Sequence, residues 1–184
     1  MGTQWNQDKI SFRKLEESDL KLMHQWFNTP HVSQWWKIDG KRNPGYEEVS
    51  KHFIPNISGS HPTKCYIVAY DKTKVAFVQS ALIKDNPQFE EAFKIDGNIA
   101  GIDIFIGEEQ YLHKGLGSLI IKAFLTDIIF KIYNTDLCII DPEPENKIAI
   151  RAYEKCGFHY IKTVWNPIDK VWAYVMIINK QSVC

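Results

Sequence analysis

The segment Tyr111-Leu-His-Lys-Gly-Leu-Gly117 directly follows a strand-like run and opens a strongly apolar one. A strand, a glycine-containing turn and a helix N-terminus together aim several backbone N–H groups at one point, with the helix dipole behind them. Gly115 and Gly117 have no Cβ, so the backbone there can turn tightly and approach a ligand closely. The placement favours a phosphate or pyrophosphate ligand, although glycines before a helix are as often simple turn residues.

A single carboxylate, Asp103, interrupts the apolar run 99–106, where an unpaired charge would be costly. If this run is a strand, period-two alternation places Asp103 on the same face as Gly101 and Phe105, opposite the last three isoleucines of the run. Two interpretations follow from the residues alone: a salt bridge or cap at a strand end, or a group that performs acid–base chemistry.

A helix with well-marked ends is expected between Asn146, a capping residue, and Gly157, which favours a left-handed C-cap. Tyr153 shares its apolar face with two alanines and Cys156, at i, i+3, i+4 and i+7 spacing. Taken alone, this position indicates a core tyrosine rather than a reactive hydroxyl.

Length, hydrophobic content and charge together indicate the general class of protein to which the chain belongs. The chain has 184 residues, 45% of them hydrophobic, and equal numbers of acidic and basic residues, which indicates one well-cored domain over 1–184 and no nucleic-acid partner. We expect neither a signal peptide nor a membrane span, and Asn6 stands where a myristoylation motif requires Ser or Thr. Four cysteines without paired spacing predict reduced core thiols in a cytoplasmic protein, and six histidines show no metal-ligand spacing.

The helices and strands that position these residues are predicted from the spacing of apolar residues and from the capping, glycine and proline residues that end such elements. A helix from a Ser18 cap to Phe27, and three more over 46–54, 115–131 and 147–156, are expected, while 84–97 is an acidic insertion of undefined structure. Strands are expected over 9–15, 65–70, 75–83, 99–106, 136–140, 158–164 and 171–178. The predicted fold is α/β (α+β): a mixed, mostly antiparallel sheet of six to seven strands flanked by about four helices.

This order of elements, with the glycine loop after the fourth strand, resembles the GNAT acyl-CoA-dependent N-acetyltransferases. Within that superfamily the chain is most similar to the aminoglycoside 6'-N-acetyltransferases, although siderophore-type lysine acyltransferases share several of the same blocks. The matching blocks lie in order from Leu15 onward and are His31-Val-Ser-Gln-Trp-Trp36, Tyr66-Ile-Val-Ala69, Gln79-Ser80, Gly101-Ile-Asp103, Lys114-Gly-Leu-Gly117, Asp141-Pro and Ala149-Ile-Arg-Ala-Tyr-Glu-Lys-Cys-Gly-Phe158.

The resemblance implies acetyl-CoA as the cofactor. It assigns the pyrophosphate to the backbone N–H groups of His113–Ser118 and implies an oxyanion donor in the backbone near Ile104 or Phe105. One departure is Leu112, which stands where the superfamily usually has Gln or Arg. The implied cofactor-binding residues are Ile104, Phe105, Ile106, His113, Lys114, Gly115, Leu116, Gly117, Ser118, Asn146, Ala149 and Tyr153.

The resemblance also implies the catalytic roles and the acceptor. Asp103 would hold the substrate ammonium and accept its proton, and Tyr153 would protonate the departing thiolate, by direct transfer in a ternary complex. An aminoglycoside is a polycation, so its site requires several carboxylates in a neutral protein. The implied substrate-binding residues are Trp35, Tyr66, Gln79, Glu90, Glu91, Asp103, Asp141 and Asp169, with Trp36, Asp96, Glu143 and Glu145 as further candidates.

Two other functions remain open at this stage. A siderophore or lysine-type N-acyltransferase would keep the chemistry and change the acceptor, and a longer acyl donor would require a roomier pocket beside Gly101. A non-catalytic acyl-CoA-binding domain would need neither Asp103 nor Tyr153, and the presence of both argues against it. We expect a monomer or a homodimer, with no metal, nucleic-acid or membrane partner.

Overall fold

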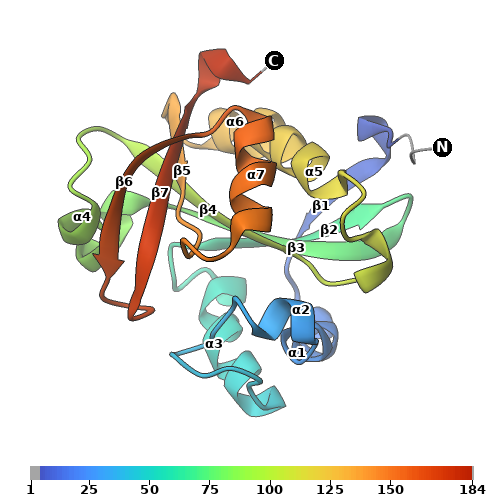
Figure 1. Ribbon diagram of the computed structural model, residues 1–184. Coiled ribbons are helices and arrows are strands. Elements are labelled where there is room, and N and C mark those ends of the chain that lie inside the picture. Colours follow the sequence, from blue (N-terminus) through green and yellow to red (C-terminus); the bar gives the residue numbers. More distant parts are fainter. Residues whose placement is uncertain (1–4, 184) are drawn as a thin grey trace.

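Seven strands form one sheet in the order β1-β2-β3-β4-β5-β7-β6 in the computed structural model, which describes residues 5–183 (Figure 1). Every neighbouring pair is antiparallel except β4 and β5. The expected mixed, mostly antiparallel sheet is therefore confirmed. Expectations about residues 1–4 and Cys184 lie outside the described residues. The strands are β1 Ile10–Lys14, β2 Lys64–Tyr70, β3 Thr73–Leu82, β4 Ile99–Ile106, β5 Leu137–Ile140, β6 His159–Asn166 and β7 Val171–Asn179.

The parallel strands β4 and β5 separate in the middle of the sheet. Their pairing covers only three residues of each strand and ends where Gly101 lies opposite Ile139. Beyond that point β5 ends at Ile140, while β4 continues to Ile106, paired with β3 alone. The β5-facing backbone of the second half of β4 thus has no strand partner within the described part of the chain.

Helices cover both faces of the sheet (Figure 1). One face carries α1 Leu20–Phe27, α2 Pro30–Ser33 and α3 Tyr46–Ser58, with α4 Pro87–Phe93 beside β6. The other face carries α5 Leu116–Phe124, which continues through a π-helical turn at Leu125–Ile129 into α6 Phe130–Ile132, and α7 Lys147–Cys156. Short 3-10 segments are Gln7–Lys9, Glu17–Asp19, Ile83–Asp85, Glu109–Tyr111 and Lys180–Ser182.

The side chains of β4 alternate between two hydrophobic clusters. Ile102, Ile104 and Ile106 pack into the cluster beneath α5 and α7. Phe105 lies in the opposite cluster, with its ring centroid 5.3 Å from that of Phe27 in α1. Alternation then places Asp103 on the Phe105 face, as expected from the sequence, beneath the α1–α3 layer.

Several expected boundaries are corrected. Ser18 does not cap the first helix; a 3-10 turn precedes α1, and Glu16 and Asp19 form a capping box around that turn. The buried Asp19 carboxylate forms ion pairs with Arg13 and Lys74, whose nitrogens each lie 2.8 Å from Asp19 Oδ1. The second helix extends to Ser58, and the acidic insertion contains α4, which the sequence left undefined.

Three further matters raised by the sequence, the cysteines, membrane-spanning helices and metal ligands, can be compared with the structure. Cys65, Cys138 and Cys156 are buried free thiols, as predicted for these three residues. Within residues 5–183, no helix is long and apolar enough to cross a membrane. Nor do His, Cys, Asp and Glu residues gather into a possible metal site in that range.

Candidate active site

A cavity of about 600 Å³ opens on the α1–α4 face of the sheet, above the point where β4 and β5 separate. Asp103 and Gln79 lie at the sheet, and the loop after β5 supplies Asp141. Asn146 and Tyr153 also line this cavity although they belong to the start and the middle of α7, on the opposite face. The cavity therefore reaches through the gap between the two strands.

Asp103 is held by its neighbour on β3. Gln79 is its register partner, and Gln79 Nε2 donates a 2.9 Å hydrogen bond to Asp103 Oδ2. Burial raises the pKa of Asp103 to about 6, since the Gln79 hydrogen bond, which favours the ionised form, only partly offsets the desolvation, and the charge of Asp169 adds to the rise. No ion pair to Asp103 exists within residues 5–183. Asp103 is thus a partly desolvated carboxylate suited to accept a proton near neutral pH.

Asn166 links two further carboxylates of the cavity. Its Nδ2 donates to Asp169 Oδ2 at 2.9 Å, and its Oδ1 accepts the backbone N–H groups of Ile168 and Asp169. Its side-chain amide also favours the ionised form of Asp141 and so lowers the pKa of that carboxyl. Burial outweighs this effect and, with the charges of Asp103 and Asp169, raises the pKa of Asp141 well above its usual value. Three mutually repelling carboxylates therefore face one cavity, which favours a ligand with several positive charges.

Tyr153 provides a protonated hydroxyl on the other side of the strand gap. Its side chain is only 8% exposed. Burial raises the pKa of its hydroxyl, and the negative charges of Asp103 and Asp141 raise it further. At neutral pH the hydroxyl therefore keeps its proton and can act as a donor.

The start of α5 forms a cradle of backbone N–H groups. Gly115 is its N-cap with φ of +84°, a left-handed conformation that favours glycine. A Cβ at this position would meet no atom of the described chain within 4 Å, so open space lies in front of it. The N–H groups at the start of a helix lack intrahelical partners, so those of Leu116, Gly117 and Ser118 can receive an anion.

The side chains of the cradle have other partners. Lys114 Nζ donates to the Gln110 carbonyl at 2.7 Å, so the expected help of its charge requires this bond to open. Ser118 Oγ donates to the Ala152 carbonyl at 3.3 Å, and Cys156 Sγ donates to the Ser118 carbonyl at 3.4 Å. These contacts join α5 to α7, which leaves the backbone as the anion-binding element. His113 has φ of +58° in the same turn.

The remaining implied cofactor residues lie along the strand gap. Asn146 caps α7 by accepting the Ala149 N–H at 3.1 Å, the capping role expected from the sequence. Ala149 packs at the margin of the α5–α7 cluster, as do Ile104 and Ile106. The Ile106 carbonyl accepts a 3.0 Å hydrogen bond from His31 Nε2, and the Phe105 ring is engaged in the opposite cluster. Apart from the Ile106 carbonyl, the backbone of β4 is therefore the part of this strand that can bind a ligand along the gap between β4 and β5.

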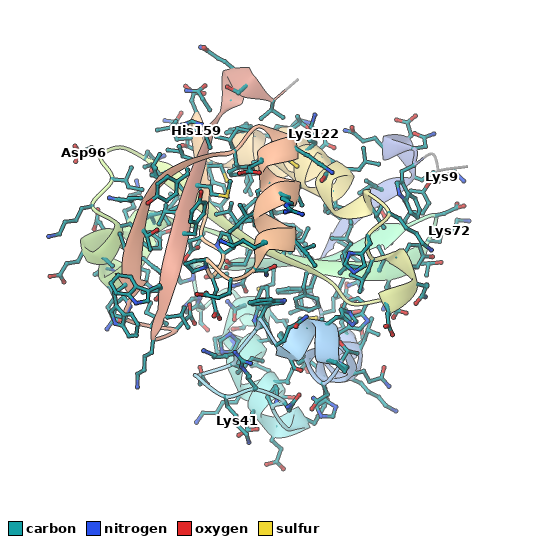
Figure 2. The ribbon with its side chains drawn as sticks, viewed as in Figure 1. Lys9, Lys41, Lys72, Asp96, Lys122 and His159 are labelled. Atoms are coloured by element: carbon teal, nitrogen blue, oxygen red, sulfur yellow. The ribbon has the colours of Figure 1, made fainter. Side chains whose placement is uncertain are left out.

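Three residues implied for the acceptor do not reach the cavity. Tyr66 lies on the far side of the sheet, where it is 6% exposed and packs edge-on against Phe124 of α5. Glu90 and Glu91 lie on the exposed side of α4, whose phenylalanines face the cavity instead. Figure 2 shows Asp96 at the outer edge of the molecule, also away from the site.

Trp35 does line the cavity, and Trp36 lines it while packing its ring 5.0 Å from that of Phe105. Sequence reasoning missed other residues of the wall. Asn166 carried a signal, because an Asn before a Pro favours a turn in which the Asn side chain accepts backbone N–H groups, but its effect on Asp141 needs the tertiary fold. Other residues of the wall that sequence reasoning missed include Lys37, Asp39, Lys51, His52, Asp85 and Phe89.

Comparison with known proteins places this site in a family. The family described as "Acetyltransferase (GNAT) domain" matches residues 16–165. "Aminoglycoside N(6')-acetyltransferase type 1" of Klebsiella pneumoniae is 30% identical over 177 residues, which cover 95% of this chain and 85% of that protein. The protein of the same name from Serratia marcescens matches to the same extent.

Solved structures agree with the sequence relatives. The structure of AAC(6')-Ib in complex with ribostamycin and coenzyme A superimposes with a TM-score of 0.84 and 28% identity, and covers 95% of this chain and 96% of that one. AAC(6')-Ib in complex with paromomycin and acetyl-CoA gives a TM-score of 0.83 at the same identity and coverage.

Proposed function

This chain belongs to the GNAT acetyltransferase family, and from that premise we propose that it acetylates the 6'-amine of aminoglycoside antibiotics with acetyl-CoA. The observation that carries the proposal is the convergence of Asp103, Asp141 and Asp169 on one cavity that also reaches Tyr153. A polycationic acceptor needs such a set of carboxylates, and transfer to its amine needs a base and an acid on either side of the reacting atoms.

The residues present fit acetyl-CoA. The open N-terminus of α5 at Gly115 suits its pyrophosphate, and the edge of β4 at Ile104 and Phe105, which has no strand partner beyond β3, offers backbone groups to its amide-bearing arm. Asn146, Ala149 and Tyr153 would form the other wall of that channel. Acetyl-CoA supplies an acetyl group activated as a thioester.

Asp103 prepares the amine in this proposal. Its carboxylate binds the acceptor as an ammonium and takes up one proton, directly or through a water molecule, which frees the nitrogen lone pair for attack on the acetyl carbonyl. The same proton is later released to solvent. Burial keeps the pKa of Asp103 near 6, closer to that of its substrate than an exposed aspartate would be.

Tyr153 completes the proton balance. Its buried hydroxyl donates a proton to the departing sulfur as the carbon–sulfur bond breaks, while the newly acylated nitrogen releases its second proton to solvent and the tyrosine regains a proton from solvent. Since the reacting groups are brought together directly, no enzyme nucleophile is required, and the buried thiols Cys65, Cys138 and Cys156 have no step to perform.

The acceptor is recognised by charge and by one exposed aromatic face. Asp141 and Asp169 bind ammonium groups away from the reacting one, and Trp35 offers its ring to a sugar or an ammonium group. Acetylation removes one positive charge from the drug, which accounts for a role in resistance. The free thiols support a cytoplasmic location, and the proposal holds for a monomer or a homodimer.

Two antibiotics that differ at one atom test the proposal. Neomycin carries a 6'-amine and paromomycin a 6'-hydroxyl, so acetyl-CoA-dependent thiol release should be rapid with neomycin and absent with paromomycin. Mass spectrometry should show a single added acetyl group at the 6' position. Thiol release with a lysine-derived amine but with neither antibiotic would show that the acceptor is a lysine-type amine and not an aminoglycoside.

A further inference from the structure

One wall of the acidic cavity carries a lysine that the proposed chemistry does not use. Lys37 lines the same cavity as Asp103, Asp141 and Asp169 and is half-buried. Within residues 5–183 it makes no hydrogen bond and no ion pair, in contrast to Lys41, which lies at the outer end of the α1–α3 layer and pairs with Glu48 at 2.7 Å (Figure 2). A positive charge in a cavity built for a polycation requires an explanation.

The backbone holds Lys37 firmly in place. Trp36, before it, packs its ring 5.0 Å from Phe105, and Ile38, after it, is almost fully buried. Ile38 and Lys41 exchange two backbone hydrogen bonds of 2.9 Å, which close a tight turn. The lysine therefore leaves a fixed point of the cavity wall, and only its side chain can adjust.

The charge of Lys37 acts on one carboxylate in particular. Burial raises the pKa of Asp169, while the hydrogen bond from Asn166 and the positive charges of Lys37 and His52 oppose the rise. His52 Nδ1 is itself 3.3 Å from Asp39 Oδ1, so that histidine already has an acidic partner. Of the two cations whose charge acts on Asp169, Lys37 is thus the one without an ion pair among residues 5–183.

We propose that Lys37 is a specificity-determining residue that selects acceptors with a hydroxyl rather than an amine next to Asp169. This inference rests on the proposed function. An ammonium of the acceptor that approaches this part of the wall meets the positive charge of Lys37 and is repelled. A hydroxyl at the same place can accept a hydrogen bond from the lysine and donate one to Asp169.

Kanamycin A and kanamycin B are a suitable pair, because they differ only in a hydroxyl or an amine at C2'. That carbon lies across the reacting sugar ring from the 6'-amine, and the charge of Asp169 is felt by Asp103, which receives that amine. The wild-type enzyme should prefer kanamycin A. Lys37→Met should raise the ratio of kcat/KM for kanamycin B to that for kanamycin A by about tenfold, as expected for removal of one like charge from a partly desolvated site.

Two control variants separate this effect from general ones. Lys37→Arg keeps the charge and should keep the wild-type ratio. Lys21→Met removes a charge from the exposed side of α1, outside the cavity, and should also keep it. Circular dichroism should show that all three variants are folded.

A ratio that stays within twofold of wild type in Lys37→Met, or that changes equally in Lys21→Met, would overturn the role of Lys37 and leave the proposed function intact. If the wild-type enzyme acetylates neither kanamycin, the proposed function fails, and the selection by Lys37 fails with it.

Discussion

Gln79 and Asp103 lie directly opposite each other on β3 and β4, and the amide of Gln79 donates a 2.9 Å hydrogen bond to the carboxylate. The bond fixes which Asp103 oxygen is occupied and leaves Oδ1 for the acceptor. It also favours the ionised carboxylate in a site where burial favours the neutral acid. A glutamine from the neighbouring strand therefore sets both the direction and the basicity of the proposed base.

Replacing this glutamine should move the pH profile. Gln79→Leu removes a hydrogen bond to a charged group, so the pKa of Asp103 should rise above about 6. The acidic limb of kcat/KM against pH should then shift upward by roughly half a unit to one unit. Activity at pH 6.5 should fall more than activity at pH 8.5, a pattern that simple loss of packing would not produce. An unmoved acidic limb would assign the titration to another group.

A second prediction concerns the cradle at the start of α5. Gly115→Val places a branched side chain in the open space before the helix, where the pyrophosphate is proposed to bind, without a clash inside the protein. The strain of a β-branched residue at φ of +84° costs about 1–3 kcal/mol, which a folded domain can tolerate. Calorimetry should show loss of coenzyme A binding with unchanged circular dichroism.

Gly59→Val is the matched control for this variant. Gly59 ends α3 with φ of +80° and likewise has no atom within 4 Å of an added Cβ, but it lies in neither the cradle nor the cavity. The control carries the same backbone strain and should bind coenzyme A normally. Equal loss of binding in both variants would trace the effect to stability rather than to the cradle.

Local signals explain why some elements were predicted correctly and others were not. The bounds of α7 follow from Asn146 and Gly157, which mark its two ends, and the uniformly apolar run of β4 has the length of a buried strand. In β2, residues 65–68 are all buried, so alternation does not reveal which face Tyr66 takes.

The assembly of the site depends on contacts between distant segments. The gap between β4 and β5 arises from a pairing that ends at Gly101, and no sequence pattern marks that point. Lys37 and Asp169 are brought to one cavity by the packing of the α2–α3 segment over the sheet. Spacing along the chain carries no information about such a meeting, whereas Asp103 could be found because it breaks an apolar strand.

A third prediction separates activity from stability at Asp103. Asp103→Asn keeps the shape and removes the basic carboxylate, so turnover should fall by about two orders of magnitude or more, with little change in coenzyme A affinity. Because the pKa of Asp103 is higher in the folded than in the unfolded chain, stability falls as pH rises from about 4 to about 6, and this cost then stays constant at higher pH. The variant lacks this cost.

Thermal unfolding of the protein without ligands can measure that cost. Asp103→Asn should unfold a few degrees above wild type at pH 7.5, and the difference should shrink as pH falls below about 6 and vanish below about 4, where the wild-type carboxyl becomes protonated in both states. A variant that is less stable than wild type at pH 7.5 would show that Asp103 serves the fold rather than the reaction.

The acceptor side is tested by the carboxylates that do not touch the reacting amine. Asp141→Asn and Asp169→Asn should each raise the acceptor KM more than they lower kcat, because they remove attraction to parts of the substrate remote from the reaction. Wild-type KM should increase with salt, since attractions between partly exposed charges are screened over about 10 Å near 0.1 M ionic strength. Each variant should show a shallower salt dependence than wild type.

Glu91→Gln, on the exposed side of α4, removes a carboxylate outside the cavity and should leave both KM and its salt slope unchanged. If Glu91→Gln weakens binding as much as Asp169→Asn does, the acceptor is attracted by the general surface and not by the carboxylates of the cavity.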